Sequence, residues 1–106
     1  MLRRVSKFKP FTAATTDTTV HEVSENRTLV VTNIIANNKE SSAVIISLYD
    51  GASSAENQKL EITVPANSTK EILMPNDNGI EFTTSVVAQV SAHSNGSSIW
   101  IGGYED

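Results

Sequence analysis

Hydrophobic and polar residues alternate with a period of two along much of this chain. The pattern is clearest near the middle, where Leu60, Ile62 and Val64 alternate with Glu61 and Thr63. Such alternation is expected when one face of a β-strand meets a core and the other face meets water. Residues 65–68, which begin with a proline, then form a turn, and a second strand-like stretch follows. This part of the chain therefore predicts two strands joined by a tight connection.

The same arrangement recurs along the chain, with turn-forming sequences about every 8 to 14 residues. The predicted strands are residues 19–23, 29–36, 43–49, 60–64, 69–74, 80–82, 86–92 and 99–101. No stretch has the apolar spacing of a surface helix without a β-branched run or a break inside it. We therefore predict an all-β, single-domain antiparallel β-sandwich of about eight strands, with a jelly roll as the leading topology. Alternation and short turns are equally typical of an immunoglobulin-like sandwich.

The length and composition limit the classes of protein that fit. A chain of 106 residues has room for one domain with one core. The absence of cysteine excludes disulfides, thiolate metal sites and a cysteine nucleophile. The apolar runs are far shorter than the ~20 residues of a membrane-spanning helix, so no membrane partner is expected. The first residues lack the apolar stretch of a secretory signal.

Charge is distributed unevenly between the N-terminus and the rest of the chain. Residues 17–106 hold four basic and all twelve acidic residues, a formal net charge of −8, whereas the preceding residues carry only basic charges. We therefore predict a basic N-terminal arm, residues 1–16, attached to a β-sandwich domain, residues 17–106. The acidic body would repel a nucleic acid, so the arm is expected to bind a protein partner, with a disordered, solvated tail as the alternative. Its expected partner-binding residues are Arg3, Arg4, Lys7, Phe8, Lys9 and Phe11.

Catalytic and metal-binding patterns are weak. The two histidines, His21 and His93, lack an activating partner at motif spacing, and a Gly-x-Ser-x-Gly segment is absent. Residues 76–79 gather oxygen-bearing side chains but lack the spaced carboxylates of a calcium loop. We expect no catalytic residues, no metal, no cofactor and no enzymatic activity.

Three aromatic residues near strand ends form a second candidate site. Trp100 and Tyr104 fall on one face of the last strand, and Tyr49 lies near the end of another. An exposed platform of such side chains could stack on sugars or anchor a partner, whereas packing in the core is the alternative. Gly102 and Gly103, just before Tyr104, predict a bulge or a close approach between backbones.

Several strand-and-turn segments together resemble a known family. They are residues 29–37, 42–50, 62–69 and 71–73, with a closing pattern over residues 86–92 and 98–104. The chain resembles small β-sandwich virion proteins of tailed bacteriophages, which attach to heads or tails as decoration, cement or accessory subunits. The resemblance covers about residues 19–104, and its motifs include no catalytic signature.

The resemblance implies a non-enzymatic virion structural protein. A capsid decoration or cement subunit would bind copies of itself, as a trimer, and a major capsid or tail protein, without nucleic acid. Its location would be the virion, assembled in the host cytoplasm. The alternative is a carbohydrate- or host-surface-binding β-sandwich module of a tail or fibre.

Overall fold

The structure is a computed structural model that describes residues 2–74 and 79–106, and over these residues the protein is all-β. The only helical segment described is the single 3-10 turn η1 (Ala55–Asn57). No helix in the described part of the chain is long and apolar enough to cross a membrane. The strands are β1 (Arg3–Pro10), β2 (Thr18–Glu22), β3 (Leu29–Asn38), β4 (Val44–Asp50), β5 (Gln58–Val64), β6 (Ser68–Leu73), β7 (Ile80–Phe82), β8 (Ser85–Val90) and β9 (Ser97–Glu105).

The predicted all-β sandwich is confirmed, and each of the eight predicted strands corresponds to one of β2 to β9. Most ends differ by one or two residues. The largest difference is in β9, which extends well beyond the predicted residues 99–101. Residues 75–78, between the predicted strands 69–74 and 80–82, lie outside the described residues.

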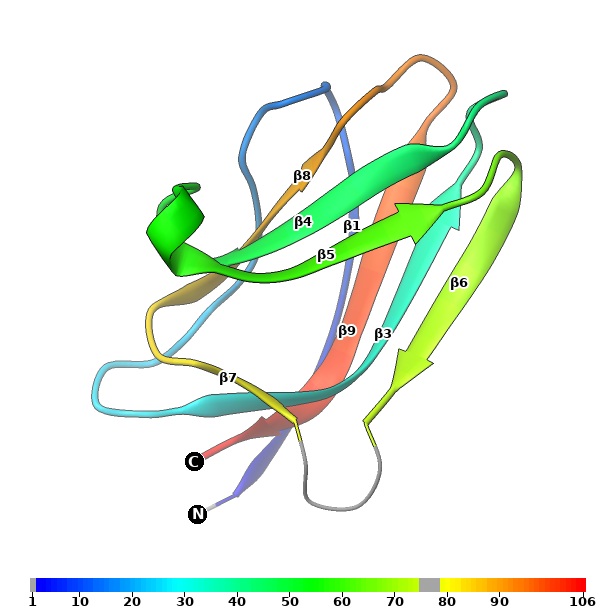
Figure 1. Cartoon of the computed structure of the whole chain (residues 1–106). Helices are drawn as coiled ribbons and strands as arrows, with labels where there is room; N and C mark the ends of the chain where they lie inside the picture. The colour runs from blue at the N-terminus through cyan, green and yellow to red at the C-terminus, as the bar shows by residue number, and fades with distance from the viewer. Residues whose placement is uncertain (1, 75–78) are drawn as a thin grey trace.

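The strands form two antiparallel sheets that face each other (Figure 1). Sheet A has the order β1-β9-β3-β6, with β7 also paired to β3, and sheet B has the order β2-β8-β4-β5. The pairs β1–β9, β2–β8, β3–β6 and β4–β5 are nested along the chain, as in one long hairpin folded over on itself. This nesting defines a jelly roll and distinguishes the fold from an immunoglobulin-like sandwich.

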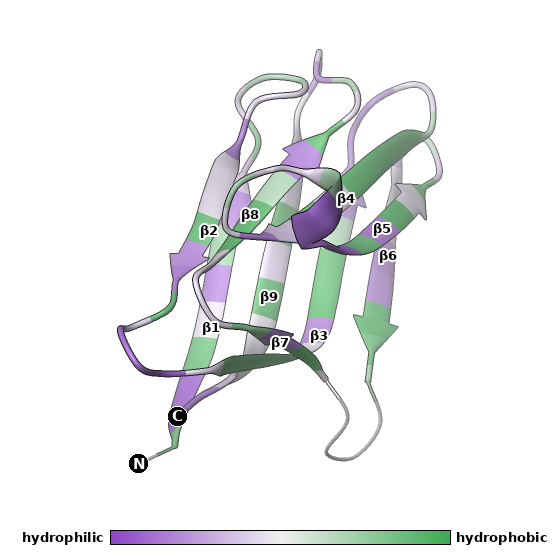
Figure 2. Cartoon of the chain, turned by 60° about the vertical axis from the view of Figure 1, so that its left-hand side comes forward, coloured by the Kyte–Doolittle hydropathy of each residue, from purple (hydrophilic) through white to green (hydrophobic). Residues whose placement is uncertain are grey.

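The core lies between the two sheets and is built from the inward-facing residues of each strand. Alternating apolar and polar bands are visible along several strands in Figure 2. In β4, for example, Val44, Ile46 and Leu48 are fully buried. The largest fully buried side chains are Phe82, Leu29, Ile34, Ile46, Leu48, Ile62, Ile99, Ile101, Val31, Val44, Val64 and Val86. Apolar burial on this scale is the main stabilising contribution to the fold.

The N-terminal segment differs from the prediction of a separate arm. Residues 3–10 form β1, the edge strand of sheet A, which pairs with β9 along its whole length. Val5 and Phe11 are buried in the core. The boundary predicted between residues 1–16 and 17–106 therefore does not separate two bodies. Because one strand face carries mostly charged residues, the segment lacks the apolar alternation by which strands are recognised.

Two carboxylates fix the turns at the two ends of β8. Asp50, at the end of β4, accepts hydrogen bonds from the backbone N–H groups of Thr83, Thr84 and Ser85, at 2.9–3.3 Å. Glu40 accepts N–H bonds from the turn at residues 94–96, at 2.8–2.9 Å. Several backbone N–H hydrogen bonds to a carboxylate stabilise its charged form relative to the protonated form.

The pKa values of both carboxyl groups are lowered. For Glu40, the backbone hydrogen bond from Ser94 is the main cause. For Asp50, burial acts to raise the pKa, but the backbone hydrogen bonds, led by that of Thr84, outweigh it. Both side chains therefore stabilise the fold in their ionised form.

Candidate functional site

The three aromatic residues of the predicted platform do not lie on one surface. Trp100 and Tyr104 are on the outer face of sheet A, and each lies two positions from Gly102 along β9. Tyr49 is on the outward-facing side of β4, in sheet B. The two outer faces point in opposite directions, so the platform of three is wrong and only the Trp100–Tyr104 pair remains.

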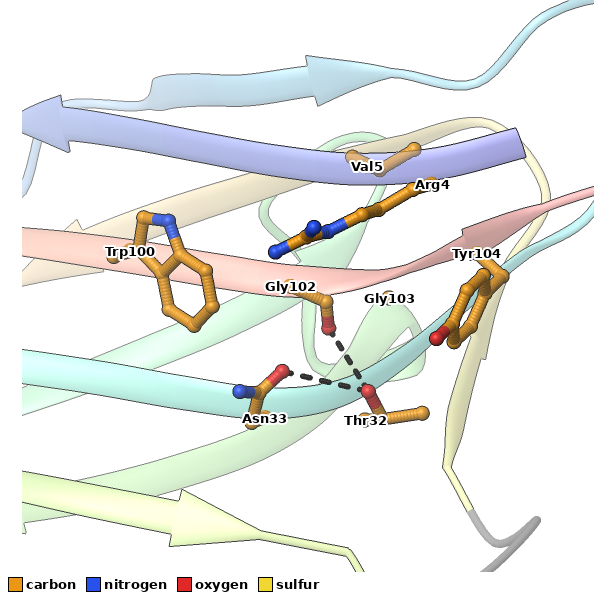
Figure 3. Close-up of a pocket in the computed structure, with 8 residues that line it drawn as sticks. All are labelled: Arg4, Val5, Thr32, Asn33, Trp100, Gly102, Gly103 and Tyr104. Atoms are coloured by element: carbon orange, nitrogen blue, oxygen red, sulfur yellow. Dashed lines mark hydrogen bonds between the residues drawn. The ribbon is translucent and has the colours of Figure 1, made fainter.

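That pair borders a shallow pocket on the outer face of sheet A (Figure 3). The pocket has a volume of about 270 Å³. It is lined by Arg4, Val5, Thr32, Asn33, Trp100, Gly102, Gly103 and Tyr104. These residues come from β1, β3 and β9, three adjacent strands, so the pocket exists only in the assembled sheet.

Trp100 is held in place by its polar edge. Its indole Nε1 donates a hydrogen bond of 2.9 Å to Ser6 Oγ on the neighbouring strand β1. The other end of the indole lies over Gly102, where an added Cβ would come within 2.5 Å of Trp100 Cη2 and 2.6 Å of Asn33 Oδ1. The missing side chain of Gly102 therefore makes room for the edge of the indole and for the Asn33 side chain above β9.

A β-bulge in β3 directs two consecutive polar residues into this pocket. The register between β3 and β9 shifts between Val31, which pairs with Gly103, and Asn33, which pairs with Gly102. Thr32 is the additional residue, and neither it nor Asn33 is buried, whereas the flanking Val31 and Ile34 are. Bulges of this kind re-aim side chains and are common next to functional sites.

The polar groups of the pocket leave hydrogen-bond donors available. The Thr32 hydroxyl lies 3.4 Å from both Asn33 Oδ1 and Gly102 O, and donates toward these acceptors. Among the described residues, the Nδ2 group of Asn33 has no hydrogen-bond partner and the Arg4 guanidinium has no ion pair. Figure 3 shows the Arg4 side chain extending from β1 across β9 toward Gly102.

The free edge of β1 forms a second surface. The Phe11 N–H donates to Ser97 O at 2.8 Å, so alternation along the antiparallel pair directs the backbone N–H groups of Arg4, Ser6 and Phe8 away from β9. The backbone nitrogen of Pro10 also points away from β9, and it carries no N–H. A groove of about 460 Å³ follows this edge and is lined by Arg3, Arg4, Val5, Ser6, Lys7 and His21.

The six expected arm residues divide between this edge and the core. Arg3, Arg4, Lys7 and Lys9 are exposed on β1, and Phe8 is 62% exposed. Phe11 is only 3% exposed and belongs to the hydrophobic core. Because it packs against the protein's own core, Phe11 is not an anchor for a partner.

The two histidines do not share a site, because His21 on β2 pairs with Val86 near the start of β8, whereas His93 lies beyond the end of β8. His21 Nε2 is 2.7 Å from Glu105 Oε1, a contact that joins β2 of sheet B to β9 of sheet A. This hydrogen bond is the main cause of the lowered pKa of the Glu105 carboxyl. The Nδ1 atom of His93 is buried and has no hydrogen-bond partner in the described part of the chain.

Metal-ligating side chains do not gather within residues 2–74 and 79–106, where no group of three or more His, Asp or Glu could hold an ion. Of the oxygen-bearing segment 76–79, for which no metal was expected, residues 76–78 lie outside the described residues.

Comparison with known proteins gives a similarity of fold only. No protein-family model and no curated protein matches the sequence. Among solved structures, the chain is similar to one from the virus-like particle of the extra small virus of the giant freshwater prawn Macrobrachium rosenbergii. The two are 10% identical, the match covers 99% of this chain and 79% of that chain, and the TM-score is 0.45. At this level the similarity says nothing about function, which has to be argued from the surfaces described above.

Proposed function

We propose that this chain is a non-enzymatic structural subunit of a virion, a capsid decoration or cement protein that binds the surface of a particle. Its sequence resembles small virion proteins of tailed bacteriophages. A jelly roll is a fold that viral capsid domains use, although lectin domains use it too. The observation that carries the proposal is the free, basic edge of β1.

This edge has the features of a surface for a protein partner. The unpaired N–H groups of Arg4, Ser6 and Phe8 could pair with an extended segment of another chain, as in β-strand addition. Four basic side chains line the strand, so β1 strands of two copies would repel each other if they paired. The complementary partner is an acidic surface or segment.

An acidic surface of that kind is available in a neighbouring copy. Residues 17–106 carry a formal net charge of −8, so β1 of one subunit is attracted to the body of the next. A contact between two different surfaces closes into a ring when the rotation between subunits permits it, as in a trimer. A major capsid or tail protein with an acidic segment would be the second partner, and many weak contacts on a particle would add up through multivalency.

The test is the solution mass of the full chain and of two charge-reversal variants, measured by light scattering. The first variant changes Arg3, Lys7 and Lys9 to Glu and leaves Arg4 and the buried Val5 and Phe11 intact. The matched control changes Lys39, Lys59 and Lys70, all exposed outside β1, to Glu and alters the net charge equally. We expect an oligomer for the native chain and the control, and a monomer for the β1 variant.

Two results would contradict the proposal. One is a native chain that stays monomeric at high concentration and low salt. The other is an oligomer that both variants retain equally, since the basic edge would then make no contribution. Circular dichroism melts of all three proteins establish that the comparison is between folded chains.

A second candidate function is recognition of a carbohydrate on a host surface. The pocket between Trp100 and Tyr104 favours it, because exposed aromatic rings beside polar groups are typical of sugar-binding sites. In that case the subunit would serve at a tail or fibre.

A further inference from the structure

The pocket on the outer face of sheet A combines two aromatic rings with two donor groups, on Asn33 and Arg4, that lack a protein partner among the described residues. From this combination we propose that it binds one sugar ring that carries a carboxylate, such as a uronic acid unit of a surface polysaccharide. The proposal rests on the second candidate function above and names its ligand class.

The apolar part of the site suits a sugar ring. Trp100 and Tyr104 point to the same side of β9 at positions four residues apart, so about 13 Å of strand separates them. Gly102 lies between them, and its missing side chain lets the indole lie flat over the strand. Aromatic faces pack well against the C–H face of a sugar, and the hydrogen bond from Trp100 to Ser6 fixes one of the rings before any ligand arrives.

The polar part of the site requires an acceptor-rich ligand. Asn33 Oδ1 is directed toward the Thr32 hydroxyl, which leaves the Nδ2 group to donate outward. The Arg4 guanidinium is a donor fork without an ion-pair partner among the described residues. A planar guanidinium binds a carboxylate through two parallel hydrogen bonds, and the amide can donate to a hydroxyl oxygen of the same sugar.

The size of the pocket limits the ligand to one ring. Its volume of about 270 Å³ lies just under the usual range of ~300–1,000 Å³ for small-molecule sites. Longer saccharides would extend over the neighbouring exposed surface of sheet A.

The test is a titration of the ¹⁵N-labelled full chain, followed by NMR. Three probes are compared: methyl β-D-glucuronide, the neutral methyl β-D-glucoside, and glucose 6-phosphate. We expect the glucuronide to bind most tightly and to shift the signals of Trp100 Nε1–H, Gly102 N–H and Asn33 Nδ2. Loss of the charge-assisted contact in Arg4→Met should weaken glucuronide binding about tenfold and leave glucoside binding nearly unchanged.

Substitutions inside and outside the pocket distinguish sugar binding in the pocket from sugar binding at other surfaces. Gly102→Ala places a methyl group where the edge of the Trp100 ring and Asn33 Oδ1 lie, so it should displace both side chains and abolish binding of all three probes. Lys70→Met removes a positive charge from β6, and Tyr49→Ala removes the aromatic ring on the opposite sheet; both should bind like the native chain. The spectrum of each variant also shows whether it is folded.

Three outcomes would overturn the proposal: no shifts at these residues with the glucuronide, equal affinity for the acidic and the neutral sugar, or equal affinity for the phosphate. If Gly102→Ala still bound the glucuronide, the sugar would have to bind elsewhere on the protein, and the proposal would also be overturned. None of these results affects the assembly role, because that role depends on Arg3, Lys7 and Lys9 and is read from the solution mass.

Discussion

Gly102 and Gly103 are neighbours in β9, but they meet different surroundings. An added Cβ at Gly103 would lie 2.0 Å from Val30 O and 2.9 Å from Val31 Cα, both backbone atoms of β3. At Gly102 the nearest atoms are the ends of the Trp100 and Asn33 side chains. Gly103 is needed to bring β9 and β3 together beside the bulge, and Gly102 is needed to make room for the Trp100 ring and the Asn33 side chain. The close backbone approach predicted from this glycine pair is confirmed at Gly103.

Gly103→Ala should therefore destabilise the protein much more than Gly102→Ala. We expect the free energy of unfolding to fall by about 2–4 kcal/mol for Gly103→Ala, because a strand must shift, and by about 1 kcal/mol for Gly102→Ala. Urea unfolding of both variants measures the difference. Equal losses would show that the approach of β9 to β3 is not the constraint described here.

At the scale of the element, β1 is an edge strand divided between solvent and core, since Val5 is buried and the other seven residues of the strand are exposed. Its two phenylalanine positions illustrate the division, since Phe8 projects from the outer face and Phe11, just after the strand, enters the core. A truncation that begins at Thr12 would remove a complete edge strand and uncover β9. Such a truncation would report on folding as well as on subunit contacts, which is why charge reversal is the better test of assembly.

The same division predicts different effects of two matched substitutions. Phe11→Ala should lower the free energy of unfolding by about 3–5 kcal/mol, since it creates a cavity in the core. Phe8→Ala should change it by no more than about 0.5 kcal/mol, because the ring is largely exposed. Thermal or urea unfolding distinguishes the two. Similar small effects of both substitutions would indicate that the N-terminal segment is detached from the core.

For the whole molecule, four carboxylates with lowered pKa values connect distant parts of the chain. Asp50 and Glu40 hold the turns at the two ends of β8, and Glu105 joins the two sheets through His21. The pKa of Asp17 is lowered mainly by a hydrogen bond with Ser53 and also by one with Gln89. Because the pKa of each group is lower in the folded state, the stabilisation is complete above the unfolded value and is lost as pH falls through the folded value.

We therefore expect the free energy of unfolding to be steady from neutral pH to about pH 5, and to fall as the pH is lowered to about 2.5. Asp50→Asn should lower the melting temperature at neutral pH by about 5 °C or more, because an amide cannot accept the same set of backbone N–H bonds. It should also lose less stability on acidification than the native chain. Glu56→Gln, an exposed change in η1, is the control. An unchanged pH dependence in Asp50→Asn would refute the role given to this carboxylate.

Local patterns were sufficient to predict most strands and the fold class. Leu60, Ile62 and Val64 alternate with polar residues, and the strand and turn that follow need no distant information to be recognised. The pocket was predicted only in part, through Trp100 and Tyr104. Arg4 was assigned to a partner-binding arm, and Thr32 and Asn33 read as ordinary positions within a strand. A Thr-Asn pair that interrupts an otherwise apolar strand is the signal that could have indicated the bulge.

The sequence by itself determined the all-β class, the inward faces of the strands and the separation of charge between the N-terminus and the remaining chain. These follow from side-chain chemistry and a period of two, which act over a few residues. Only the tertiary structure decided that β1 joins sheet A, that Tyr49 is far from Trp100, and that Arg4, Asn33 and Gly102 meet in one pocket. Each of these depends on pairing between strands at opposite ends of the chain, whose order and register are set by how the whole nested hairpin folds over rather than by any local pattern.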